Sequence, residues 1–146
     1  RYVQSGGTFA SPPSEYFGSQ RPNLRGAVDF AIDDRGAIYV LLADGTLNRY
    51  LDGVTQPFNY ANFPIGQQLT SADAMYLDNN PTGQLIYIAS RARGTIYQVS
   101  LTGTFWASYR AFDETLFAGI AGVIVTPQDL VYVVSGNAIL AFQKSG

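Results

Sequence analysis

One pattern of apolar strands and polar turns recurs along this chain every 45 to 48 residues, and it restricts the possible folds more than any other feature. Tyrosines recur 48 and 45 residues apart, at Tyr39, Tyr87 and Tyr132. Aromatic residues recur again 47 and 45 residues apart, at Tyr50, Tyr97 and Phe142. Units of this length bury their apolar faces against their neighbours in repeat proteins. We therefore expect about three copies of one small β-unit.

Each copy divides into short strands joined by turns. The first strand is apolar and is expected at 28–32, 74–77 and 123–125. The second is almost wholly apolar, which is typical of a strand buried on both faces, and is expected at 37–42, 85–89 and 130–134. Gly or Asn then allows a tight hairpin turn, and third strands are expected at 46–50, 95–99 and 138–142. A more polar fourth strand, suited to an outer edge, is expected at 56–61 and 104–111.

These units resemble the blades of NHL-type and gluconolactonase-like propellers. The resemblance rests on a strand followed by Asp-x-x-Gly-x-(Ile/Leu)-Tyr-Val, as in 33–40, then by a Gly hairpin and (Ile/Leu)-x-x-(Tyr/Phe). It implies an all-β fold of β-propeller-like repeats of four-stranded antiparallel blades. We expect an N-terminal linker with one blade-completing strand at 1–23, blade 1 at 24–68, blade 2 at 69–116, and a three-stranded partial blade 3 at 117–146.

The residue types limit the chemistry that such blades can perform. Gluconolactonase-like enzymes hold a divalent metal in the central channel with Glu, Asn and Asp. The only glutamates of this chain are Glu15 and Glu114, and neither is on an expected inner strand. With no His and no Cys, it can form neither Ser-His nor Cys-His couples, nor thiolate or imidazole zinc sites. We predict a non-catalytic binding or assembly module with no cofactor and no metal. The alternative is a channel-centred hydrolase or lactonase.

The net charge and the length of the apolar runs limit the classes of partner that we expect. The net charge is −2 and the basic residues form no cluster, so we expect no nucleic-acid partner. The longest apolar runs are far shorter than the ~20 residues of a transmembrane helix, so we expect no membrane insertion. The expected partner is a protein or a small ligand at the channel-mouth loops. The absence of Cys leaves the compartment open, with a preference for a bacterial extracytoplasmic location.

Four charged residues are the candidates for ligand binding. Asp29 and Asp73 are expected on inner strands near the channel, although an Asp at the start of a strand more often accepts a backbone N–H. Arg91 and Arg93 flank a hairpin turn on the surface expected to carry the channel mouth. There they can bind a carboxylate or phosphate in a bidentate manner, or they can be solvated edge charges. We predict no catalytic residue.

The two ends resemble complementary parts of one blade. Gly7-Thr8-Phe9-Ala10 is similar to Gly103-Thr104-Phe105-Trp106, where a fourth strand is expected to begin, and the third copy stops after its third strand. Propellers usually have four to eight blades, so three do not readily close a ring. We expect a six-bladed homodimer, in which strand 8–10 pairs with strand 138–142 of another copy. The alternative is that the chain is part of a larger ring and docks on the remaining blades of a parent chain. The first residue, Arg1, also fits a processed product or a piece of a longer chain.

Overall fold

Three antiparallel sheets form the body of the protein. In the computed structural model, residues 4–5, 8–9, 14–19, 21–80 and 83–144 are described. Sheet 1 consists of β3 (Ala27–Ile32), β4 (Ile38–Leu42), β5 (Leu47–Leu51) and β6 (Val54–Gln56). Sheet 2 consists of β7 (Ala74–Asp78), β8 (Leu85–Ser90), β9 (Thr95–Ser100) and β10 (Phe105–Tyr109). Sheet 3 consists of β11 (Ile120–Val125), β12 (Leu130–Ser135) and β13 (Ala138–Gln143), and the short 3-10 helix η1 (Glu114–Phe117) precedes it.

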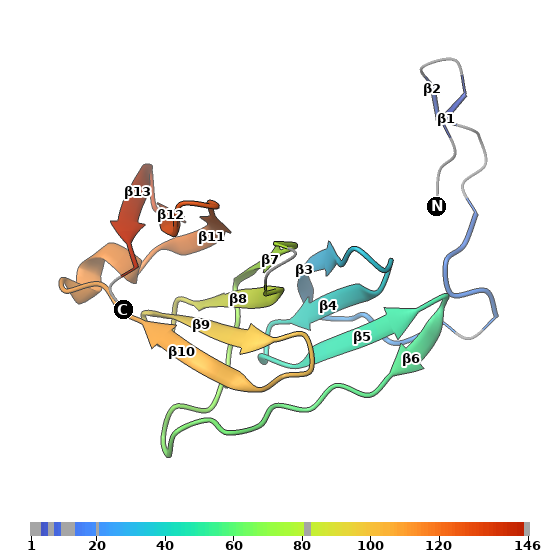
Figure 1. Cartoon of the computed structure of the whole chain (residues 1–146), viewed down its shortest axis with the longest axis horizontal. Coiled ribbons are helices and arrows are strands. Elements are labelled where there is room, and N and C mark those ends of the chain that lie inside the picture. The colour runs from blue at the N-terminus through green and yellow to red at the C-terminus, as the bar shows by residue number, and fades with distance from the viewer. Residues whose placement is uncertain (1–3, 6–7, 10–13, 20, 81–82, 145–146) are drawn as a thin grey trace.

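Each sheet is a meander, in which every strand pairs with the next strand along the chain. Figure 1 shows the sheets following one another from right to left in chain order, with β6 and β10 on the lower side. The first strands of the sheets lie together, since β7 contacts both β3 and β11. The protein is therefore all-β, and consecutive sheets repeat the same connectivity.

Two apolar clusters hold the three sheets together. The first lies between sheets 1 and 2 and contains Tyr39, Leu41, Ile86 and Ile88, all 0% exposed. The second lies between sheets 2 and 3, where Tyr87 and Ile96 pack with Val131 and Val133. Side chains alternate between the two faces of a strand, so sheet 2 contributes one set to each cluster and is buried on both faces.

The turns are built from residues that satisfy the backbone locally. The Asp33 carboxylate accepts the backbone N–H groups of Arg35 and Ala37 at 3.0 and 2.8 Å, which closes the turn between β3 and β4. Gly103 has φ +95°, and a Cβ at this position would overlap the carbonyl oxygen of Asn59. The turn between β9 and β10 and the connection that follows β6 approach each other at Gly103, and only glycine fits there.

The prediction of a fourth strand at Gln56 to Ala61 in the first unit is wrong. The strand is β6, which ends at Gln56, and Ala61 instead forms an isolated parallel bridge with Thr104 of the next unit. Pro57 has no N–H to donate to a ladder, so it ends the strand. The residues beyond it enter the space between sheets 1 and 2, where Phe58, Tyr60 and Phe63 pack against the first cluster.

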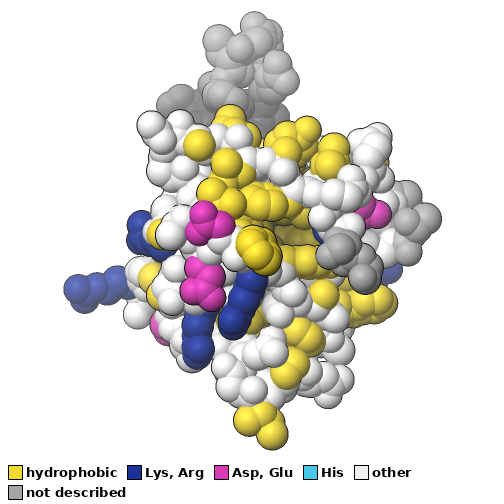
Figure 2. Space-filling view, turned by 90° about the vertical axis from the view of Figure 1, so that its left-hand side faces the viewer, with side chains coloured by type: hydrophobic (Ala, Val, Ile, Leu, Met, Phe, Trp, Pro, Cys, Tyr) yellow, Lys and Arg dark blue, Asp and Glu magenta, His cyan; other side chains and the backbone are white. Residues whose placement is uncertain are grey.

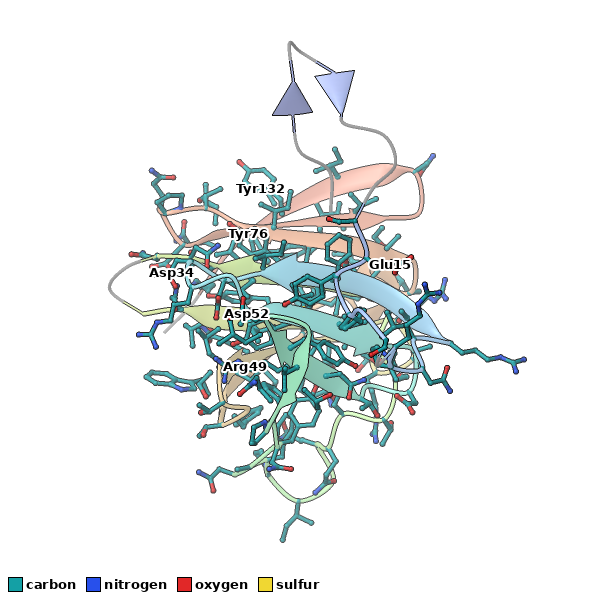
Figure 3. The ribbon with its side chains drawn as sticks, turned by 90° about the vertical axis from the view of Figure 1, so that its right-hand side faces the viewer. Glu15, Asp34, Arg49, Asp52, Tyr76 and Tyr132 are labelled. Carbon is teal, nitrogen blue, oxygen red and sulfur yellow. The ribbon has the colours of Figure 1, made fainter. Side chains whose placement is uncertain are left out.

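Tyr132 does not occupy the core, although it matches two core residues in the repeat. Tyr39 is 0% and Tyr87 is 1% exposed, whereas Tyr132 is 37% exposed. Figure 3 labels Tyr132 on the outer side of sheet 3, with Tyr76 between sheets 2 and 3. All three tyrosines point toward the following sheet, and no described sheet follows sheet 3. Tyr132 occupies the same repeat position as Tyr39 and Tyr87, but no described sheet covers it.

The N-terminal strands stand apart from the three sheets. β1 (Gln4–Ser5) and β2 (Thr8–Phe9) pair with each other, and neither joins a sheet of the body in the described part of the chain. The predicted fourth-strand equivalent, 8–10, thus includes a real strand at Thr8–Phe9, while Gly7 and Ala10 lie outside the described residues. Among those residues, no helix has the length and apolar character needed to cross a membrane.

Candidate anion-binding site

Three arginines meet around one hollow at the loops beside sheets 2 and 3. The hollow has a volume of about 370 Å³ and is lined by Arg91, Ala92, Arg93, Gly94, Arg110, Glu114 and Ala118. Arg91 and Arg93 belong to the turn between β8 and β9, and Arg110 directly follows β10. Figure 2 views the molecule from the left-hand side of Figure 1, and Lys and Arg side chains gather there beside Asp and Glu side chains.

The turn that carries two of these arginines is fixed by its own backbone and by Thr95. Gly94 has φ +54°, which glycine adopts without steric cost, and its N–H donates to the carbonyl of Arg91 at 3.1 Å. The hydroxyl of Thr95 donates to the carbonyl of Arg93 at 2.8 Å. Thr95 is only 1% exposed, so the turn is attached directly to the packed sheet.

Arg91 is held in place by Asp73. A terminal guanidinium nitrogen of Arg91 lies 3.0 Å from Asp73 Oδ1, and the backbone N–H of Arg91 donates to Asp73 Oδ2 at 2.7 Å. The two oxygens of one carboxylate thus bind the side chain and the main chain of the same residue. This arrangement fixes the start of β7 against the turn after β8. Both carboxylate oxygens of Asp73 are therefore already bound within the protein.

Arg93 and Arg110 are each positioned through Nε by a threonine. Arg93 Nε donates to Thr70 Oγ1 at 3.4 Å, and Arg110 Nε donates to Thr95 Oγ1 at 3.1 Å. Within the described part of the chain, these are the side-chain hydrogen bonds of the two arginines. Their terminal nitrogens therefore have no protein partner there, and such planar pairs of donors match the oxygens of carboxylates and phosphates.

The charge around the hollow differs in sign from that of the whole chain. Three guanidinium groups lie near two carboxylates, those of Glu114 and Asp73, so the local balance is positive whereas the chain carries −2. Glu114 is placed by the start of η1, where the Asp113 carboxylate accepts the Thr115 N–H at 3.0 Å. Hydrogen bonds from the side chain and backbone of Thr115 lower the pKa of Asp113.

Asp29 lies apart from the arginines and supports the backbone. Its Oδ1 accepts the N–H of Phe30, and its Oδ2 accepts the N–H of Met75, both at 2.8 Å. The second bond crosses from β3 to β7 and joins the first strands of sheets 1 and 2. Asp29 also lines a hollow of about 220 Å³ that extends along Met75, Val123 and the open side of sheet 3.

The structure thus brings together Asp73, Arg91 and Arg93 of the four predicted site residues and places Asp29 in a different contact. Sequence reasoning missed Arg110. It lies 17 residues beyond Arg93, at the end of an expected edge strand, and no local motif connects it to the hairpin. Among the described residues, no group of three or more His, Cys, Asp or Glu is placed to hold a metal ion.

Comparison with known proteins gave no relative for this chain: no protein-family model matches it, and no curated protein matches its sequence.

Proposed function

We propose that this chain is a non-catalytic β-propeller module that binds anionic groups at its loop face. The three sheets are taken as consecutive blades of the NHL-like kind. Support for the blades comes from their common meander, their face-to-face packing and the contacts of β7 with β3 and β11. In propellers, inner strands surround a central channel and the loops at its mouth often bind ligands.

The observation that carries the binding proposal is the convergence of Arg91, Arg93 and Arg110 on one hollow. Carboxylates and phosphates are the ligand groups that suit it, because each guanidinium presents parallel N–H donors to two oxygens. Arg93 and Arg110 are the recognition residues, since only their Nε atoms bind other side chains among the described residues. Arg91 contributes charge, and Asp73 holds it in place.

The non-catalytic part of the proposal rests on the residue types that the chain supplies. Without His or Cys, it has no imidazole base and no thiolate nucleophile. Both oxygens of Asp29, and both oxygens of Asp73, already accept hydrogen bonds or pair with charges within the protein. Neither carboxylate is arranged to accept a proton from a substrate.

Titration calorimetry with two probes, citrate and inorganic phosphate, tests the proposal. We expect saturable binding of at least one probe with a dissociation constant of about 1 mM or tighter, equivalent to about −4 kcal/mol. Arg93→Gln and Arg110→Gln should each weaken it at least tenfold, a loss of about 1.4 kcal/mol. Added salt should also weaken it, because the hollow is open to solvent and its charges are screened.

Arg35→Gln is the matched control, since Arg35 is exposed and lies in the turn between β3 and β4, away from the hollow. It should leave binding unchanged. Equal weakening by Arg35→Gln would show only a nonspecific charge effect. No saturable binding of either probe, or of an acidic peptide, would refute the site. Binding of the peptide without either small anion would assign the hollow to a protein partner.

A further inference from the structure

We infer that two copies of this chain close one ring of six sheets, with sheet 3 of each copy packed on sheet 1 of the other. The inference uses the proposed propeller arrangement but not the arginine site. It rests on the chemistry of the two outer faces, which repeat the two sides of the interfaces already present within the chain.

The outer face of sheet 3 is apolar and uncovered. Its exposed side chains are Ile124, Tyr132, Val134 and Ile139, and Ile139 is 74% exposed. In the strand ladders, Ile124 and Ala141 lie opposite Tyr132, and Ile139 lies opposite Val134, so these residues share one face. This face corresponds to the side of sheet 1 that carries Tyr39 and packs on sheet 2.

The outer face of sheet 1 has the pattern of a face that packs on a preceding sheet. Phe30 and Ile32 lie opposite Val40 and Ile38 across the β3–β4 ladder, and Phe30 is 65% exposed. Sheets 2 and 3 carry apolar pairs at the equivalent positions of their first and second strands. Sheet 2 buries its pairs against sheet 1, and sheet 3 buries its pairs against sheet 2. Those pairs are Met75 and Leu77 with Ile86 and Ile88 in sheet 2, and Val123 and Val125 with Val131 and Val133 in sheet 3.

In all three sheets, an aromatic side chain from the connection before the sheet lies on this face. We call these rings the linker aromatics: Phe17, Phe63 and Phe117. Each contacts the aromatic residue of the third strand that follows it, with ring centroids 4.9 Å apart for Phe17 and Tyr50, 5.9 Å for Phe63 and Tyr97, and 5.2 Å for Phe117 and Phe142. Phe63 and Phe117 lie in the interfaces between sheets.

Phe17 therefore occupies an interface position in front of sheet 1, although no described sheet lies there. Phe17 and Tyr16 border a groove of about 500 Å³ that continues along Val28, Phe30 and Val40. In the interface between sheets 1 and 2, the ring of Phe58, in the connection that precedes sheet 2, lies 6.2 Å from the ring of Tyr39 in sheet 1. Tyr132 is the residue equivalent to Tyr39, so it is the side chain expected to face the connection that precedes sheet 1 in a second copy.

A second copy fits both faces because a single chain supplies both halves of the interface. Sheet 3 offers the side that faces a following sheet, and sheet 1 offers the side that faces a preceding one. Propellers typically contain four to eight blades, and six is the only multiple of three in that range. Two copies related by a two-fold axis thus form two identical interfaces and leave neither face open. Apolar faces left open would expose the chain to uncontrolled association.

Sedimentation of the full chain at micromolar concentration tests the stoichiometry. We expect a species of twice the 15.8 kDa chain mass. Phe30→Asp and Ile124→Glu should each shift it to single chains, since each places a charge in the inferred interface. Val54→Glu is the control, because Val54 is 60% exposed but lies on neither of the two faces, and it should stay dimeric. Circular dichroism of each variant checks that it is folded.

Cysteine cross-linking tests the arrangement independently, since the chain contains no cysteine of its own. The first strands of adjacent sheets lie together, so β11 of one copy is expected beside β3 of the other. A mixture of Ile124→Cys and Phe30→Cys chains should cross-link efficiently with a short bis-maleimide. The control mixture of Ile124→Cys and Val54→Cys should not. A monomer, an open-ended polymer, or a dimer without the Phe30–Ile124 link would overturn the inference.

Discussion

Removing the side chain of Tyr87 is the most direct test of the packing between sheets 2 and 3. Tyr87 is 1% exposed and lies in the second cluster beside Ile96 and Val131. Tyr87→Ala deletes a buried aromatic ring and should lower the free energy of unfolding by about 3 to 5 kcal/mol. The loss combines the transfer of the ring from water with the cavity that remains when strands on both sides hold their positions.

The hydroxyl of Tyr87 contributes separately. It accepts hydrogen bonds from Gln98 Nε2 at 2.9 Å and from Lys144 Nζ at 3.0 Å, and Gln98 is itself buried. Tyr87→Phe keeps the ring but leaves the buried Nε2 of Gln98 without its acceptor, while Lys144 keeps its ion pair with Asp129, so the substitution should cost about 1 to 3 kcal/mol. We therefore expect Tyr87→Ala to be the more destabilising of the two, with Tyr87→Phe between it and the native protein.

Urea unfolding followed by far-ultraviolet circular dichroism measures both losses, provided that the denaturant dependence stays constant among the variants. Tyr132→Ala is the matched control, since it occupies the same repeat position but is exposed in the single chain. At concentrations where single chains prevail, it should cost less than about 1 kcal/mol. A loss below about 1 kcal/mol for Tyr87→Ala would refute the packing described here.

Three further predictions concern the backbone and pH. Asp29→Asn should lower stability by about 1 to 3 kcal/mol, because it weakens the bonds to the Phe30 and Met75 N–H groups, and should leave citrate and phosphate affinities unchanged in calorimetry. Gly103→Ala should lower the urea midpoint well below that of Gly83→Ala, since a Cβ overlaps Asn59 at the first position and meets open space at the second. Burial raises the pKa of Tyr39 from 10.0 to about 12, so the stabilisation present below pH 10 should be lost as the pH rises toward 12. Tyr39→Phe should reduce this alkaline loss, and an unchanged pH profile would contradict the assignment.

The sequence alone predicted the three sheets of the body and most of their strands and turns. Each strand pairs with its neighbour along the chain, so alternating apolar residues and local turn residues such as Asp33 and Gly94 suffice to specify a meander. The repeat also identified Tyr39, Tyr87 and Tyr132 as equivalent positions. It could not show that Tyr132 is exposed, because exposure depends on whether another sheet lies against that face.

Only the tertiary structure decided where distant residues meet. Pro57 ended an expected strand, and Phe58, Tyr60 and Phe63 became part of an interface rather than an edge. Arg110 joined the hairpin arginines, and Asp29 accepted an N–H from a residue 46 positions away. These contacts arise from the packing of one sheet on another, which local patterns do not encode. The meander was therefore predictable, whereas the candidate site was predictable only in part.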